Sequence, residues 1–84
     1  MIQAFLSDAA EKILTELTAR EQAAVETVRR SLEDHPVQGR TLPGMDNRVV
    51  EILPEAAGGR GISVVYRYHQ ELAAALILWL IAGP

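Results

Sequence analysis

The sequence of 84 residues contains no cysteine, only four aromatic residues and no long run of basic side chains. Without cysteine, disulfide bonds cannot stabilise the fold. The two histidines, His35 and His69, have no cysteine at ligand spacing, which argues against a structural metal site. We therefore expect no metal and no cofactor. A chain this short is marginally stable by itself, so association with another chain is the remaining means of support.

The formal net charge is −3, and it is unevenly distributed. Residues 1–34 hold four basic and seven acidic side chains, whereas residues 35–84 hold four of each. Long-range attraction to nucleic acid requires a surplus of positive charge. The charge pattern therefore does not favour nucleic-acid binding over the whole molecule.

No apolar segment is long enough to be a membrane-spanning helix. The terminal apolar run without a polar side chain, 72–82, has eleven residues, whereas a spanning helix needs roughly 18–20. The N-terminus lacks the basic start and continuous apolar core of a signal peptide. We expect a cytoplasmic protein.

The first 36 residues predict a short strand and a helical hairpin. Residues 1–6 are mostly apolar, and Ser7 and Asp8 then provide N-caps for a helix whose apolar residues recur with helical spacing. Thr18 and Glu21 form a second capping signal, so a second helix is expected to about residue 33, ended by Pro36.

The remaining residues predict an irregular connection followed by three antiparallel strands. Turn formers concentrate at 35–47, and β-branched residues follow. The expected elements are a strand at 48–53, a mobile hairpin loop at 54–61, a strand at 62–68, a turn at 69–71 and a strand at 72–82. The predicted fold class is α+β, in the order β-α-α-β-β-β, with the helical hairpin packed on one face of a largely antiparallel sheet. Residues 1–84 are expected to form a single domain.

The terminal strand is apolar on both of its predicted faces. Side chains alternate between the faces of a strand, which would place Leu76, Leu78 and Leu80 on one face. Ile77, Trp79 and Ile81 would lie on the other. Two short helices can cover only one face of a sheet. We therefore expect these six residues to include a partner-binding surface, with a second copy of the chain or folding-over of segment 35–47 as alternative covers.

The order of elements and several stretches resemble the RelE/ParE superfamily of bacterial toxins, including its HigB-like branch. FLSDAAEKILTEL resembles the start of the family, and VRRSLEDHPVQGRTLPGM resembles its second helix and Pro/Gly connection. RVVEIL corresponds to an "ELR"-type strand, and ISVVYRYHQELAAALILWLIAG to the "YRvvYrv" strand, hairpin and final apolar strand. The resemblance covers nearly the whole chain.

This resemblance implies a toxin of a type II toxin–antitoxin module, of the plasmid-stabilisation kind, whose cognate antitoxin wraps the toxin. Members of the superfamily cleave messenger RNA on the ribosome or poison DNA gyrase. Aligning the "YRvvY" strand with ISVVY places Ile62 and Ser63 where the family has Tyr and Arg, and the terminal basic position near Gly83. A shifted register would instead make Tyr66 and Arg67 the "YR" pair.

The arginines are the remaining candidates for RNA chemistry, because cations bind phosphate and stabilise charge that develops on it. The candidate catalytic residues are Arg48 and Arg67, and the candidate nucleic-acid-binding residues are Arg40 and Arg60. These arginines can also be explained without a function, as solvated charges on strands or as residues at the tip of a hairpin. Three functions stay open: a toxin-like chain that binds an antitoxin, a ribosome-dependent mRNA endonuclease, and a gyrase inhibitor.

Overall fold

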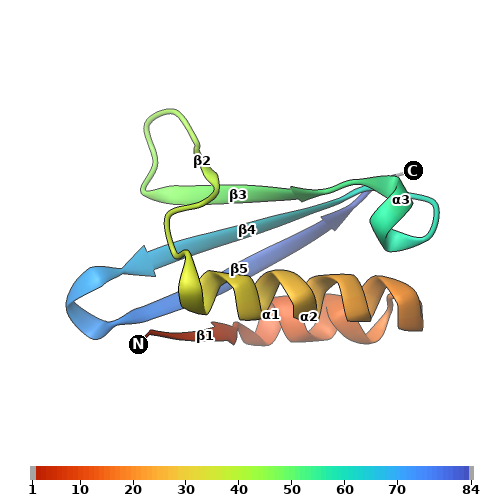
Figure 1. Ribbon diagram of the computed structural model, residues 1–84, viewed down its shortest axis with the longest axis horizontal. Helices are drawn as coiled ribbons and strands as arrows, with labels where there is room; N and C mark the ends of the chain where they lie inside the picture. Colours follow the sequence, from red (N-terminus) through yellow and green to blue (C-terminus); the bar gives the residue numbers. More distant parts are fainter. Residues whose placement is uncertain (1, 84) are drawn as a thin grey trace.

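A computed structural model describes residues 2–83 as two layers, with two antiparallel helices beneath a five-stranded sheet (Figure 1). The two helices that form one layer run in opposite directions along the same face of the sheet (Figure 1). In chain order the elements are β1 (Gln3–Leu6), α1 (Asp8–Thr15), α2 (Ala19–Asp34), β2 (Arg40–Thr41), β3 (Asn47–Ile52), α3 (Pro54–Ala57), β4 (Ile62–His69), a 3₁₀ turn η1 (Gln70–Leu72) and β5 (Ala74–Ala82).

The sheet has the strand order β1-β5-β4-β3-β2. Among the strands of residues 2–83, β1 and β5 are parallel and the other neighbouring pairs are antiparallel. The predicted α+β class and the helical hairpin on a largely antiparallel sheet are therefore confirmed. No helix within residues 2–83 is long and apolar enough to cross a membrane.

Side-chain caps start both long helices where the sequence indicates. Ser7 Oγ accepts a hydrogen bond from the Ala10 backbone N–H at 3.1 Å and caps α1. Thr18 and Glu21 form a complete capping box at the start of α2, with bonds of 2.9 and 3.1 Å. These bonds satisfy N–H groups that have no partner within the helix.

The connections differ from the prediction in three places. The supposed irregular segment 35–47 contains the short strand β2, and the supposed mobile loop 54–61 contains α3. Pro54 opens α3 and Gly58 closes it at φ 93°, a left-handed conformation that glycine adopts without strain. The turn predicted at 69–71 is shifted: His69 ends β4, the 3₁₀ turn η1 spans Gln70–Leu72, and β5 begins at Ala74. The predicted first strand included Met1, which lies outside the described residues.

The core lies between the sheet and the two long helices. Val64, Tyr66, Ile77 and Leu80 supply the sheet side of this core and are at most 2% exposed. Ile52 and Ile62 extend the sheet side, and the helical hairpin completes the core with Ala10, Leu17, Val25 and Leu32. Burying apolar side chains of this size is worth about 1.5–3 kcal/mol each, so the covered face of the sheet carries most of the stability.

Candidate functional site

A β-bulge in β5 changes which residues lie on each face of the sheet. Val65 pairs with Trp79 and Tyr66 pairs with Ile77, so Leu78 is an extra residue on β5. Ser7 supports the bulge: its Oγ donates to the Leu78 carbonyl at 3.0 Å while its backbone N–H donates to the Ile77 carbonyl at 2.8 Å. Alternation therefore restarts after Leu78.

The predicted division of the terminal strand into two faces is wrong for this reason. Ile77 and Leu80 both point into the helix-covered core, at 0% and 2% exposure. Leu76 is half-buried and lies opposite Arg67, on the other face. That face also carries Trp79 and Ile81. A single extra residue is enough to move Ile77 and Leu80 onto the same face.

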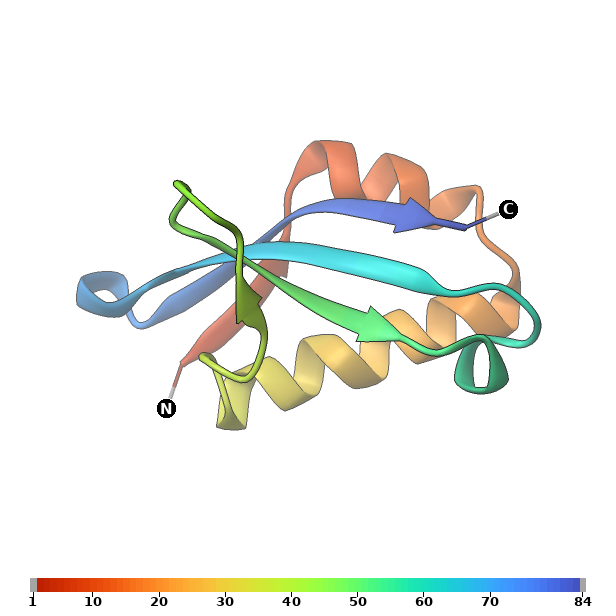
Figure 2. The same cartoon turned by 90° about the horizontal axis from the view of Figure 1, so that it is seen from above.

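The second face of the sheet, here called the open face, carries an apolar surface, and no helix of residues 2–83 lies over it. Figure 2 shows β3, β4 and β5 with only the β2–β3 connection rising above them. Phe5, Trp79 and Ile81 are each about half exposed on this face, at 49%, 49% and 52%. Val65, the cross-strand partner of Trp79, is half-buried beside them. Contiguous exposed apolar surface on a small protein marks an interaction site.

The β2–β3 connection covers part of this face. Val49 on β3 lies on the same side as Val65 and is only 5% exposed, and the neighbouring Asn47 is 8% exposed. Segment 35–47 was predicted as an alternative cover for the terminal strand, and it does not cover Trp79 and Ile81, which are 49% and 52% exposed. The surface around Phe5, Trp79 and Ile81 stays uncovered.

The two candidate catalytic arginines lie at one end of the sheet but on opposite faces, because Arg48 pairs with the buried Tyr66 and Arg67 pairs with Leu76 of the open face. Because β4 continues past the first residue of β3, Tyr68 and His69 pair only with β5. The hollow beside them, here called the notch, has a volume of about 420 Å³. Its lining residues are Val37, Asp46, Arg48, Arg67, Tyr68, His69, Gln70 and Glu71. Two carboxylates thus accompany the two arginines, so the notch has no surplus of positive charge.

Arg48 and Tyr66 hold the chain between α2 and β2 against the sheet. Arg48 Nη1 donates to the carbonyls of Val37 and Gly39 at 3.2 and 2.9 Å. The buried Tyr66 hydroxyl donates to the Pro36 carbonyl at 2.8 Å and accepts from the Gly39 N–H at 3.2 Å. Arg48 and Tyr66 therefore both have a structural role, because their hydrogen bonds hold the same backbone segment in place.

Arg67 differs from Arg48, because its Nε atom is buried and has no hydrogen-bond partner among residues 2–83. The Oδ1 atom of its cross-strand neighbour Asn47 is also buried and also has no hydrogen-bond partner among these residues. A buried donor or acceptor without a partner is costly. Arg48 is therefore held by two backbone carbonyls, whereas Arg67 Nε is buried without such a partner among residues 2–83.

Arg60 is bound within the protein by Glu21 and does not line the notch. Its Nε donates to Glu21 Oε2 at 2.7 Å, and its Nη2 donates to Glu21 Oε1 at 3.3 Å. This hydrogen bond, together with the capping bond at Thr18, lowers the pKa of Glu21 from 4.5 to about 2, and the same pairing raises the pKa of Arg60. The pair connects segment 54–61 to the start of α2. The positive charge of Arg60, which RNA binding would use, is therefore already paired with Glu21.

Arg40, the last candidate for nucleic-acid binding, is exposed on β2 and pairs across strands with Val49. The structure thus does not bring the four arginines into one cluster. Arg48 and Arg67 share the notch, Arg40 lies on the neighbouring strand, and Arg60 is paired with Glu21.

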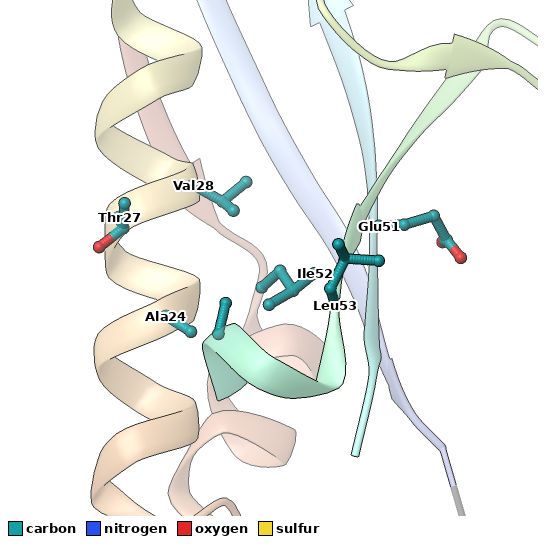
Figure 3. Close-up of a pocket in the computed structure, with 7 residues that line it drawn as sticks. Ala24, Thr27, Val28, Glu51, Ile52 and Leu53 are labelled. Carbon is teal, nitrogen blue, oxygen red and sulfur yellow. The ribbon is translucent and has the colours of Figure 1, made fainter. Parts of the chain in front are cut away.

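An apolar groove between α2 and β3 was not anticipated from the sequence. Its volume is about 370 Å³, and it is lined by Ala24, Thr27, Val28, Glu51, Ile52, Leu53 and Ala56. Figure 3 shows Val28, Ala24 and Ile52 directed into the space between the helix and the strand, with Glu51 directed away from α2. The available signal was the small residue Ala24 on α2, which leaves space beside the helix, together with the PEAA stretch that forms α3.

No protein-family model matches the sequence, and no curated protein matches it significantly. Solved structures nevertheless share its fold. The intact Escherichia coli RelBE toxin–antitoxin complex contains a chain that superposes with a TM-score of 0.80 at 14% identity, covering 100% of this chain and 99% of that one. The isolated E. coli RelE toxin gives 0.80 at 14% identity, covering 100% and 86%. A RelE mutant in the free state gives 0.78 at 15%, covering 94% and 80%. The fold of this chain is RelE-like.

Proposed function

We propose that this chain, whose fold is RelE-like, is a toxin-like component of a bacterial type II toxin–antitoxin module and binds a cognate antitoxin. The observation that carries the proposal is the uncovered apolar surface formed by Phe5, Trp79 and Ile81 on the open face. Leu76 and Val65 continue this surface between them. In a domain this small, leaving so much apolar surface in water is costly unless a partner covers it.

The residues of the open face also argue against efficient cleavage of RNA. A nuclease places cations against the phosphates and against the charge that develops on the scissile group. On the open face Ser63, Val65 and Ile81 supply no charge. Arg67 lies at one end of the same face, where Asp46 and Glu71 line the notch beside it. Removing one charge-stabilising donor commonly costs about a hundred- to a thousandfold in rate. The proposal is therefore partner binding without efficient cleavage of messenger RNA.

RNA cleavage at the notch is the second candidate function. It is favoured by the presence of Arg48, Arg67 and His69 in the lining of one hollow, since arginine binds phosphate and histidine transfers protons near neutral pH. Asp46 and Glu71 line the same hollow and offset the two positive charges. This reading ranks second because of that balance. Inhibition of gyrase needs neither set of residues, and growth arrest without RNA cleavage would favour it.

Co-expression tests the main proposal. The chain is produced alone and together with the small protein encoded in the neighbouring reading frame, and both preparations are measured by gel filtration with light scattering. We expect the chain alone to self-associate or to be unstable, and the pair to elute as one complex of defined mass. A chain that remains monomeric at high concentration and elutes apart from its neighbour would contradict the proposal.

A further inference from the structure

The two outer edges of the sheet are treated differently by the rest of the chain. At the β1 edge, side chains of α2 bind the strand backbone directly. Arg29 Nη1 donates to the Ala4 carbonyl at 3.1 Å, and the Ala4 N–H donates to Glu33 Oε2 at 3.3 Å. Arg29 is held in turn by Glu26 at 2.7 Å, an interaction that lowers the pKa of Glu26 to about 2. This edge is closed to another strand.

The β3 edge is only partly covered. Strand β2 pairs with Arg48 and Val49 and then ends. The Asn47 carbonyl points toward this edge, because it accepts from the Leu42 N–H at 3.1 Å. Backbone groups of alternate residues in an antiparallel strand point to the same edge, so the N–H and C=O of Glu51 point outward as well. Within residues 2–83 no strand lies beside Glu51.

The apolar groove of Figure 3 lies directly beside this free stretch of backbone. Ile52 and the α2 residues Ala24 and Val28 face the groove, whereas the Glu51 side chain points away from α2 (Figure 3). A strand added next to β3 would therefore meet two different surfaces. Side chains on its helix side would enter the apolar groove, and the side chain directly opposite Glu51 would meet a carboxylate.

We propose that the β3 edge binds an extended segment of a partner chain that carries a basic residue between two aliphatic residues. The basic residue would lie opposite Glu51 and exchange backbone hydrogen bonds with it, and its two aliphatic neighbours would fill the groove beside Val28 and Ile52. The inference rests on the proposed function in expecting a partner chain, but it concerns a different surface from the open face.

A second copy of this chain does not fit the edge equally well. Two β3 edges paired antiparallel about a two-fold axis at this position would set Glu51 opposite Glu51. Like charges directly opposite each other destabilise a strand pair. The charge at this edge therefore selects a basic segment of another chain.

The test uses the full chain and two synthetic blocked peptides that differ at one position, Ser-Gly-Val-Lys-Val-Gly-Ser and the same peptide with Glu in place of Lys. NMR amide shifts of the labelled protein are followed during each titration. We expect the lysine peptide to shift residues 50–53 and 24–28, to slow hydrogen exchange at the Glu51 amide, and to bind about fivefold more tightly than the glutamate peptide.

Two variants address the two parts of the interaction. Glu51→Lys should reverse the preference between the peptides. Glu51→Pro should weaken binding of the lysine peptide by about fivefold, because it removes an outward N–H and leaves the β3–β4 ladder intact. Amide spectra of both variants check that the fold is retained.

Four results would overturn the inference: no shifts with either peptide, shifts centred on Trp79, equal binding of the two peptides, or protection of the Glu51 amide that depends on protein concentration and so reports pairing of two copies. These peptides do not involve the partner protein. Failure of the peptide test with an intact partner complex contradicts only this inference, whereas absence of any partner complex contradicts only the proposed function.

Discussion

Ile77 and Ile81 have the same side chain and lie on the same strand, yet Ile77 is fully buried and Ile81 is 52% exposed. The difference comes from the cover and not from the strand. Helices α1 and α2 lie under one face of the sheet, and no element among residues 2–83 covers the equivalent part of the other (Figure 1). The chain thus makes two apolar faces and provides helices for one of them, which is the arrangement expected of a protein that is completed by a partner.

The largest predicted effect on stability comes from replacing Ile77. The same replacement at Ile81 is the matched comparison for the other face. Ile77→Ala should lower the free energy of unfolding by about 2–5 kcal/mol, because it opens a cavity in the core. Ile81→Ala should cost less than about 1 kcal/mol, since its side chain already contacts water. Urea unfolding of the two variants measures both values. Similar losses for the two would mean that the open face is covered in the isolated chain.

Ser7→Ala should have the next largest effect on stability, about 1–2 kcal/mol, because Ser7 both caps α1 and binds the bulge at Leu78. Ser7→Thr keeps the hydroxyl and serves as the control. The NMR shifts of Trp79 and Leu80 should also change in the alanine variant if Ser7 helps to set the bulge. Unchanged stability in Ser7→Ala would show that the bulge forms without this support.

Acid titration tests how segment 54–61 is fastened to α2. The pKa of Glu21 is lowered to about 2, so the stability that its ionised form contributes is complete above pH 4.5 and is lost as the pH falls toward 2. Glu21→Gln should flatten the unfolding free energy across this pH range. Glu55→Gln, which alters an exposed carboxylate on α3, should leave the profile close to that of the wild type. Equal profiles for Glu21→Gln and the wild type would argue that the pair with Arg60 is not formed in solution.

The smallest predicted effect is that of Arg67→Ala on RNA, because we expect no efficient cleavage to remove. Induced expression in a heterologous bacterium, followed by primer extension on translated messages, should show no codon-positioned cuts with either the wild type or the variant. Cuts that disappear in Arg67→Ala would establish the notch as a nuclease site and reverse the ranking of the two candidate functions.

Much of the fold could be predicted from the sequence, because its signals are local. The caps at Ser7 and Thr18, the helical spacing between them and the β-branched run at 62–68 act over a few residues each. The RelE-like arrangement followed from their order. Strand β2 and helix α3 were missed because two-residue strands and four-residue helices carry almost no periodic signal.

The candidate site was less predictable, because it depends on long-range contacts. The position of the bulge is supported by Ser7, which is 71 residues away from Leu78 in the chain, and no pattern within β5 indicates it. Arg60 looked like a free cation at a glycine-rich tip, yet it binds Glu21 across 39 residues. Pairing of charges at such separations follows from the tertiary fold and cannot be read from spacing.

The affinity of the cognate antitoxin for variants of the open face tests the central claim most directly. Titration calorimetry would compare the wild type with Trp79→Ser and with Leu72→Ser, which removes a leucine that is 70% exposed on η1, outside the sheet face. If the open face is the binding surface, Trp79→Ser should weaken the complex by about thirtyfold, as loss of a buried aromatic anchor does, and Leu72→Ser should leave it unchanged. Equal affinities for the wild type and Trp79→Ser would contradict the account.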